Sequence, residues 1–261
     1  MIRLALAFVL AAGAADAATR HMSVPGTSLT IDSPCARQVI VDPDPAYPND
    51  IVLEATADHE EETDLLVLTG GDEPRLRVQD QDHCWRPDFG LDFHPTLVIT
   101  LHVPPKSPIK IDESGASTYR LGAIGGPLSF DLSGAVNLQA ADITTLDASI
   151  SGTGQVRIAH ADGNLTADLS GTGGIELSDA MIPEASLDIS GMGGFHLADG
   201  SIGKLKLSSS GTAAVTIGGT VGDASLEISG VGKVSIAKLT GSLSKDISGM
   251  GDVVIGNQTN R

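Results

Sequence analysis

The stretch LDISGMGGFHL (187–197) decides the fold, because close variants of it recur along the chain. DLSGTGGIEL (168–177), SISGTGQVRI (149–158), EISGVGKVSI (227–236) and DISGMGDVVI (246–255) share its Ser-Gly pair and its alternating apolar residues. Successive pairs lie 18 to 20 residues apart, and a period near 20 is the signature of a solenoid. The eight pairs are Ser114-Gly115, Ser133-Gly134, Ser151-Gly152, Ser170-Gly171, Ser190-Gly191, Ser210-Gly211, Ser229-Gly230 and Ser248-Gly249.

Apolar residues occupy fixed places around each Ser-Gly pair. Counted from the glycine, offsets −6, −4, −2, +4 and +6 are apolar in every repeat except at Glu113, Ser209 and Lys245. Such alternation has the period of a half-buried β-strand. Each repeat therefore carries one strand before the pair and another after it. The chain is predicted to be all-β, a single-stranded parallel β-helix (a solenoid) with about 19 residues per rung.

The Ser-Gly pair is predicted to form the corner between the two strands of a rung. A sharp turn needs backbone conformations that glycine adopts without steric cost, so we expect the glycine of each pair to have a positive φ. Stacked rungs would align the serines in a column about 4.8 Å apart, within hydrogen-bonding reach of neighbouring rungs. Eight equivalent serines indicate a structural ladder, because a nucleophilic serine needs its own adjacent base.

The strand PTLVITLHVPP (95–105), then IKIDESGAS (109–117), then the iterated S-G-x-G corners resemble the auto-transporter adhesin head domain, or GIN domain, of exported bacterial proteins. The resemblance covers about residues 35–256. It implies a right-handed parallel β-solenoid, an exported location and no established chemistry. The family supplies no catalytic residues that could be assigned to this sequence.

The N-terminus has the features of a secretory signal peptide. Arg3 precedes a short apolar run that ends in Ala15-Asp16-Ala17, which predicts cleavage after Ala17 and a periplasmic, secreted or cell-surface location. No apolar run is long enough to span a bilayer. We divide the chain into a signal peptide (1–17), an N-terminal extension (18–34) and one solenoid domain (35–256), with irregular first rungs at 35–108 and eight regular rungs at 109–256.

The charge of the chain limits its partners. Sixteen Lys and Arg residues stand against 33 Asp and Glu residues, a net charge of −17. That charge repels nucleic acid and anionic lipid surfaces, which leaves an envelope protein or a glycan as the predicted partner. The acidic run at 59–64 is predicted to be a solvated loop. Nothing in the sequence calls for a cofactor.

Two cysteines, Cys35 and Cys84, are predicted to form a disulfide, because an exported protein meets an oxidising compartment. The bridge would close a loop of about 49 residues and remove about 4 kcal/mol of unfolded-state entropy. Two free buried cysteines are the alternative. A zinc site is not indicated, since the spacing of cysteines and histidines fits none.

Acidic residues recur at offset −3 and should form a column on the outside of the solenoid. Carboxylates on adjacent rungs repel one another, and either Ca²⁺ or solvent counterions would relieve the repulsion. We favour counterions. The residues that would hold Ca²⁺ under the other hypothesis are Asp168, Asp188, Glu227 and Asp246.

Two hypotheses about function follow from the sequence. The first is a non-enzymatic binding or structural module of the cell envelope, related to adhesion. The alternative is a carbohydrate-active enzyme, by analogy with other parallel β-helices, for which His196 with Asp188 or Arg157 with Asp168 are the available side-chain pairs. Few aromatic residues and an even spread of polar ones favour the first. The open last rung also suggests end-to-end self-association, with Lys245 as an edge guard.

Overall fold

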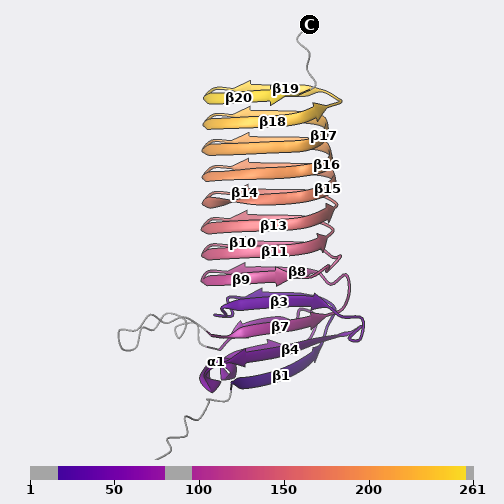
Figure 1. Ribbon diagram of the computed structural model, residues 1–261, viewed down its shortest axis with the longest axis vertical. Helices are drawn as coiled ribbons and strands as arrows, with labels where there is room; N and C mark the ends of the chain where they lie inside the picture. Colours follow the sequence, from indigo (N-terminus) through magenta and orange to yellow (C-terminus); the bar gives the residue numbers. More distant parts are fainter. Residues whose placement is uncertain (1–16, 80–95, 257–261) are drawn as a thin grey trace, which may run out of the picture.

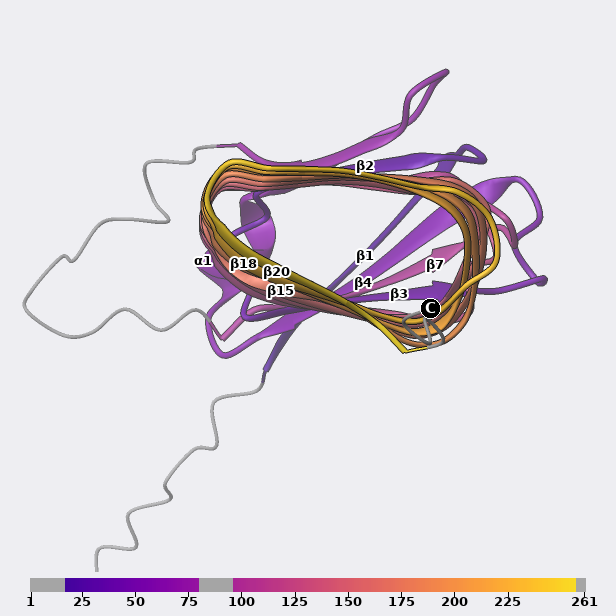
Figure 2. The ribbon, with the colours of Figure 1, turned by 90° about the horizontal axis from the view of Figure 1, so that it is seen from above.

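The chain forms a β-solenoid, as the repeat predicts. The computed structural model describes residues 17–79 and 96–256. Stacked parallel strands make about eight turns, roughly 19 residues apart (Figure 1). Seen along the solenoid axis, each turn is an elongated ring with two long sides (Figure 2).

The strand before each Ser-Gly pair lies on one long side of the ring, called face A here, and the strand after the pair lies on the other, called face B. Face A is built from β2 (Leu29–Asp32), β8 (Ile109–Glu113), β10 (Leu128–Leu132), β12 (Leu146–Ile150), β14 (Leu165–Leu169), the second halves of β15 (Thr172–Ile189), β16 (Met192–Ser209) and β17 (Thr212–Ile228), and β19 (Leu243–Ile247). Face B is built from β3 (Gln38–Pro43), β9 (Ala116–Leu121), β11 (Ala135–Ile143), β13 (Thr153–Asp162), the first halves of β15, β16 and β17, β18 (Val231–Leu239) and β20 (Met250–Ile255).

The apolar offsets point into the ring and fill it. Adjacent rungs pair residues of equal offset, so that Val156 lies opposite Ile175, and Ile175 opposite Phe195. Each of these side chains is at most 1% exposed. Burying a large apolar side chain contributes about 1.5–3 kcal/mol, and in-register stacking repeats that gain on every rung. The interior is therefore a packed core.

The three polar exceptions at inward offsets have three different outcomes. Glu113 is only 3% exposed, and its carboxylate accepts hydrogen bonds from the backbone N–H of Gly115 and the hydroxyl of Tyr119, each at 2.7 Å. Burial, with the nearby Glu113 charge, raises the pKa of Tyr119 well above its usual value. The hydroxyl of Ser209 is buried and has no hydrogen-bond partner among the described residues. Lys245 is exposed, because it lies on the last rung described.

The corners contradict the expected backbone conformation. Positive φ among the described glycines occurs at Gly71, Gly125, Gly163 and Gly200, and at none of the Ser-Gly corners. The expectation of a positive φ was therefore wrong.

Crowding between rungs explains the corner glycines instead. A Cβ at Gly191 would meet the backbone carbonyl oxygens of Ser170 and Gly171 on the preceding rung. The N–H groups of Ser190 and Gly191 both donate to the carbonyl of Leu169, at 3.1 and 3.0 Å, which draws the two corners together. Glycine is needed there because backbone approaches backbone.

The serine hydroxyls form fewer hydrogen bonds between rungs than the predicted ladder would require. The corner serines of the regular rungs are exposed. Within the described residues, corner hydroxyls form hydrogen bonds at two places: Ser229 Oγ to the carbonyl of Ser209 at 3.4 Å, and Ser114 Oγ with Ser33 Oγ at 3.1 Å. Backbone hydrogen bonds, and not hydroxyls, hold successive corners together.

The N-terminal end of the solenoid is closed by irregular strands. β1 (Ala18–Pro25) pairs antiparallel with β4 (Asp50–Ala57), and β4 pairs antiparallel with β7 (Val98–Val103), which continues face B. β5 (Leu66–Thr69) pairs antiparallel with β6 (Arg75–Val78), which lies beside β2 on face A. The segment 18–34, treated above as an extension, thus contains two strands of the sheet, β1 and β2.

The acidic run at 59–64 was predicted to be a solvated loop, and this was wrong. It contains the short helix α1 (Glu60–Asp64), which lies next to β1 and β4 at this end of the solenoid (Figure 1). The Glu62 carboxylate accepts hydrogen bonds from the N–H groups of Thr96 and Leu97, at 3.0 and 3.1 Å, and from the Thr96 hydroxyl at 2.7 Å. Three donors to one carboxylate tie the helix to the start of β7.

Two sequence predictions fall outside the described residues. The apolar run of the signal peptide lies within 1–16, and Cys84 lies within 80–95. The disulfide between Cys35 and Cys84 and the signal peptide therefore stay predictions. No helix in the described part of the chain is both long and apolar enough to cross a membrane.

Candidate functional site

A groove of about 940 Å³ runs across the strands of face B at offsets +1 to +3. Apart from Gln155, the side chains at these offsets are short on four consecutive rungs, β9, β11, β13 and β15, while the apolar offsets beside them point inward. Its polar lining residues include Arg37, Thr118, Asn137, Thr153, Gln155 and Thr172.

Register places the polar side chains of the groove in line. Thr118 lies opposite Asn137, and Asn137 lies opposite Gln155, on three successive rungs. Their hydroxyl and amide groups both donate and accept hydrogen bonds. These residues were not among those predicted from the sequence to form a site. Listing the residues at offset +3 repeat by repeat would have found them.

The groove differs in charge from the rest of this acidic protein. Arg37 is its one charged lining residue among those described. Arg120 lies two residues after Thr118 on β9 and is exposed. Further along face B, Arg157 Nε lies 3.3 Å from Glu176 Oε2, so this guanidinium is paired with a carboxylate of the next rung.

The acidic column predicted on face A is present. Asp168 lies opposite Asp188, and Glu227 lies opposite Asp246, with Ser208 between the two pairs. The four carboxylates are exposed. Among the described residues, no three His, Cys, Asp or Glu side chains are grouped so that they could hold a metal ion. Counterions around this exposed row therefore stay the prediction, and Ca²⁺ at these four residues stays the alternative.

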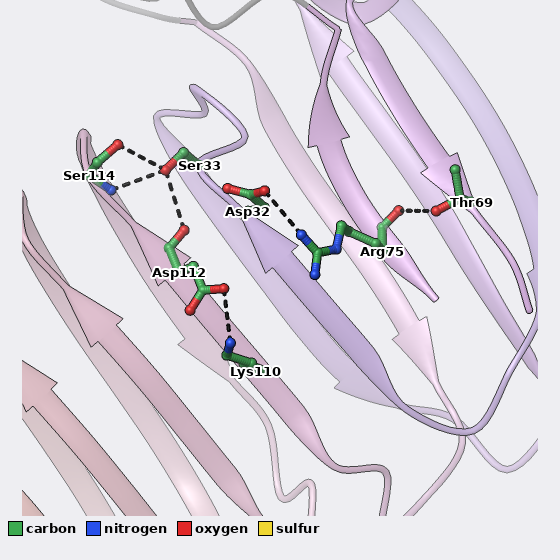
Figure 3. Close-up of polar contacts among 7 residues, drawn as sticks. All are labelled: Asp32, Ser33, Thr69, Arg75, Lys110, Asp112 and Ser114. Atoms are coloured by element: carbon green, nitrogen blue, oxygen red, sulfur yellow. Dashed lines mark hydrogen bonds and ion pairs between the residues drawn. The ribbon is translucent and has the colours of Figure 1, made fainter. Parts of the chain in front are cut away.

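Where the irregular rungs meet the first regular one, acids of face A are paired with cations (Figure 3). Arg75 Nη1 lies 3.5 Å from Asp32 Oδ2, and Lys110 Nζ lies 3.2 Å from Asp112 Oδ2. Ser33, next to Asp32, has a left-handed backbone with φ 36°, and its hydroxyl accepts a hydrogen bond from Ser114 N–H at 3.1 Å.

Apart from Lys110–Asp112, which lies within β8, the bonds in this cluster join β2 to β6 and to the β8 segment, so they fasten the irregular rungs to the regular ones. The hydroxyl of Ser33 bonds to Ser114 and to the carbonyl of Asp112 at 3.3 Å. Neither partner is a base that could activate a nucleophile. The cluster is therefore a structural joint.

A second groove on face A, of about 470 Å³, is lined by a ladder of alternating charges. Lys204 Nζ lies 3.0 Å from Glu184 Oε1, and this hydrogen bond raises the pKa of Lys204. Asp223 accepts hydrogen bonds from the N–H and hydroxyl of Ser242, both at 2.7 Å, which lower the pKa of Asp223. These charged groups are thus satisfied by partners on adjacent rungs.

The side-chain pairs considered for an enzyme are not brought together. His196 lies on face B, whereas Asp188 lies on face A, on the other long side of the ring (Figure 2). Arg157 is likewise on face B, away from Asp168, and pairs with Glu176.

His160 Nδ1 lies 2.9 Å from Asp179 Oδ2, a pair that was not predicted from the sequence. Both residues stand at offset +8 of successive repeats, so aligning that offset would have revealed them. The His160–Asp179 pair is at least one-third exposed and joins two rungs where the chain leaves face B.

Solved structures of three bacterial proteins share this fold. A candidate adhesin of Bacteroides fragilis is 17% identical, with a TM-score of 0.54 over 92% of this chain and 97% of that one. A candidate lipid-binding protein of Parabacteroides distasonis is 16% identical, with a TM-score of 0.57 over 92% and 96%. A candidate adhesin of Parabacteroides merdae is 13% identical, with a TM-score of 0.57 over 92% and 95%.

Identities this low establish the fold alone. No family model and no curated protein matches the chain. The resemblance to the GIN domain therefore stays a prediction.

Proposed function

We propose that this protein is an exported binding module of the cell envelope, related to adhesion, which holds its ligand on face B and catalyses no reaction. The observation that carries the proposal is the groove of about 940 Å³ with Thr118, Asn137 and Gln155 in line along it. A row of equal hydrogen-bonding groups suits a repetitive ligand, whereas catalysis needs one singular cluster.

The fold keeps this surface rigid before any ligand arrives. Each strand under the groove is hydrogen-bonded to a rung on both sides: β11 pairs with β9 and β13, and β13 with β11 and β15. Strands about 4.8 Å apart place one outward side chain of each column on every rung. Preorganised contacts lower the entropic cost of binding, so several weak hydrogen bonds can add up to useful affinity.

Export and adhesion rest on the sequence and on the fold. The N-terminal pattern ending at Ala17 supports export, and the candidate adhesins that share the fold support a role at the cell surface. The charge of −17 supports a protein or glycan partner over nucleic acid.

The last rung supports end-to-end contact with a second copy. Leu243, Ile247, Val253 and Ile255 are half-buried there, whereas the matching residues of inner rungs are nearly fully buried. The outer edges of β19 and β20 also have no strand partner within the described residues. Unpaired edges and partly exposed apolar side chains favour pairing with another chain.

Glycan-array and envelope-polysaccharide binding by the mature protein, residues 18–261, tests the main proposal. We expect binding that the double variant Asn137→Ala/Gln155→Ala weakens about tenfold or more. The matched variant Ser186→Ala/Ser225→Ala, on face A, should bind as the parent does. Loss of binding in the face A variant alone would contradict the proposal. Turnover of a polysaccharide or ester that one outward Asp, His or Arg substitution abolishes would establish the carbohydrate-active enzyme instead.

A further inference from the structure

The two faces of the regular rungs carry opposite charge beside the groove. On the four rungs from β8 to β15, the outward residues of face A at offsets −5 and −3 include one cation, Lys110, and four acids, a sum of −3. The four acids are Asp112, Asp131, Asp147 and Asp168. The outward residues of face B at offsets +1, +3 and +5 include two cations and one acid, a sum of +1, and Arg37 in the groove makes it +2. The charged residues at these face B offsets are Arg120, Arg157 and Glu176.

Two of the face B guanidinium groups have no carboxylate partner among the described residues. Arg157 is paired with Glu176, but Arg37 and Arg120 form no ion pair with any described residue. Both are exposed. An Arg guanidinium offers planar, paired donors that match a carboxylate, so an unpaired Arg beside a groove favours a ligand with carboxylate groups.

The remaining lining residues favour a glycan over a protein. Among the described lining residues there is no aromatic side chain and no large apolar one except Val136, which is buried. Protein interfaces rely on buried aromatic and Arg anchors, and a peptide strand cannot add to face B because every backbone edge under the groove is already paired. Hydroxyl, amide and guanidinium groups are instead the partners of sugar hydroxyls and sugar carboxylates.

The length of the groove also fits a short stretch of an extended polysaccharide. It crosses the rungs from Arg37, beside β3, to Thr172 on β15, which is four rung steps or about 19 Å. Arg37 and Arg120 lie on the adjacent rungs of β3 and β9, one step of about 4.8 Å apart along the solenoid axis.

We infer that the face B groove binds an extended, uronate-containing glycan, with Arg37 and Arg120 binding its carboxylates and Thr118, Asn137 and Gln155 binding its hydroxyls. The inference rests on the proposed function and adds the chemical class of the ligand. Without aromatic platforms in the groove, the carboxylate contacts supply the discrimination against neutral sugars.

A pair of probes of equal length isolates the role of the carboxylates. The first is an oligogalacturonate and the second is its methyl ester, in which each carboxylate is replaced by an uncharged ester. Titration calorimetry with the mature protein should show the oligogalacturonate binding about tenfold or more tightly than the ester. The difference should shrink as salt is added, because both guanidinium groups are exposed.

Charge-matched variants locate the contact. Arg37→Gln/Arg120→Gln should weaken binding of the oligogalacturonate about tenfold and leave binding of the ester unchanged. Lys110→Gln/Lys206→Gln removes the same charge from face A and should change neither affinity by more than about twofold. Thermal unfolding followed by circular dichroism confirms that the variants fold.

The inference and the proposed function fail differently. Three results would overturn the inference. They are equal binding of the two probes, no binding of the oligogalacturonate at millimolar concentration, and equal losses of its binding in the face A and face B charge variants. If another glycan or an envelope protein still binds and Asn137→Ala/Gln155→Ala weakens it, the proposed function stands. If the face B variants change the binding of no ligand, both fail.

Discussion

Replacing Gly230 by alanine tests whether crowding between rungs, and not backbone φ, requires the corner glycines. A Cβ at Gly230 would lie 2.7 Å from the carbonyl carbon of Ser210 and would also meet the carbonyl oxygens of Ser210 and Gly211. All of these are backbone atoms, so the two rungs must separate locally.

The expected loss follows from the hydrogen bonds at this corner. The N–H groups of Ser229 and Gly230 donate to Ser209 at 2.8 and 3.4 Å, and the N–H of Val231 donates to Gly211 at 2.9 Å. At about 1 kcal/mol each, three weakened bonds cost about 3 kcal/mol. The lower unfolded-state entropy of alanine returns about 0.4–1 kcal/mol, which leaves a loss of about 2 kcal/mol.

Gly232 provides a matched control two residues further along the same rung. A Cβ there would lie 3.3 Å from the carbonyl oxygen of Ala213, and 3.7 Å or more from other atoms. The preceding rung already carries an alanine, Ala213, at this offset. Gly232→Ala should therefore change stability by less than about 0.5 kcal/mol.

Urea unfolding followed by far-UV circular dichroism measures both variants, with the free energy taken from the midpoint and slope. A loss below about 0.5 kcal/mol for Gly230→Ala, or equal losses for the two variants, would refute the crowding argument. Gly230→Asn adds a further discrimination. Asparagine relieves strain at positive φ but not backbone crowding, so it should be no better than alanine.

The remaining predictions concern other parts of the molecule. Mass spectrometry of the non-reduced, secreted protein should show a peptide linked through Cys35 and Cys84; two alkylatable thiols in the folded protein would exclude the bridge. Tyr119→Phe should lower stability by about 1–3 kcal/mol, because the buried carboxylate that accepts its hydroxyl loses one of two donors; an unchanged urea midpoint would contradict this. Since the folded-state pKa of Tyr119 is raised, its contribution to stability is present below pH of about 10, the unfolded value, and falls as the pH rises above it; phenolate absorbance in the folded protein near pH 10 would argue against the burial. Ca²⁺ should leave the thermal midpoint unchanged if solvent counterions screen the acidic column; a rise that Asp188→Asn removes would identify a calcium site instead. Sedimentation at increasing protein concentration should show self-association that Val253→Lys weakens; a monomer at all concentrations would contradict end-to-end contact.

The repeat by itself determined the solenoid, because strand formation and facing depend on local alternation. Any residue at offset −4 or +4, such as Leu187 or Phe195, must point inward once its neighbours alternate with it. The recurring Ser-Gly pair then fixes the register, so the acidic column through Asp168 and Asp188 was also predictable from the sequence.

Tertiary structure decided what depends on the distance between rungs and on the shape of the ring. Gly191 is required by carbonyl groups 20 residues earlier in the chain, which no local turn preference contains. Arg157 pairs with Glu176 and not with Asp168, because the corner at Gly171 sends the two acids to opposite sides of the ring. The groove arises in the same way, since short side chains form a hollow only when four rungs stack in register. Local alternation sets which way each side chain points, and stacking sets which side chains meet.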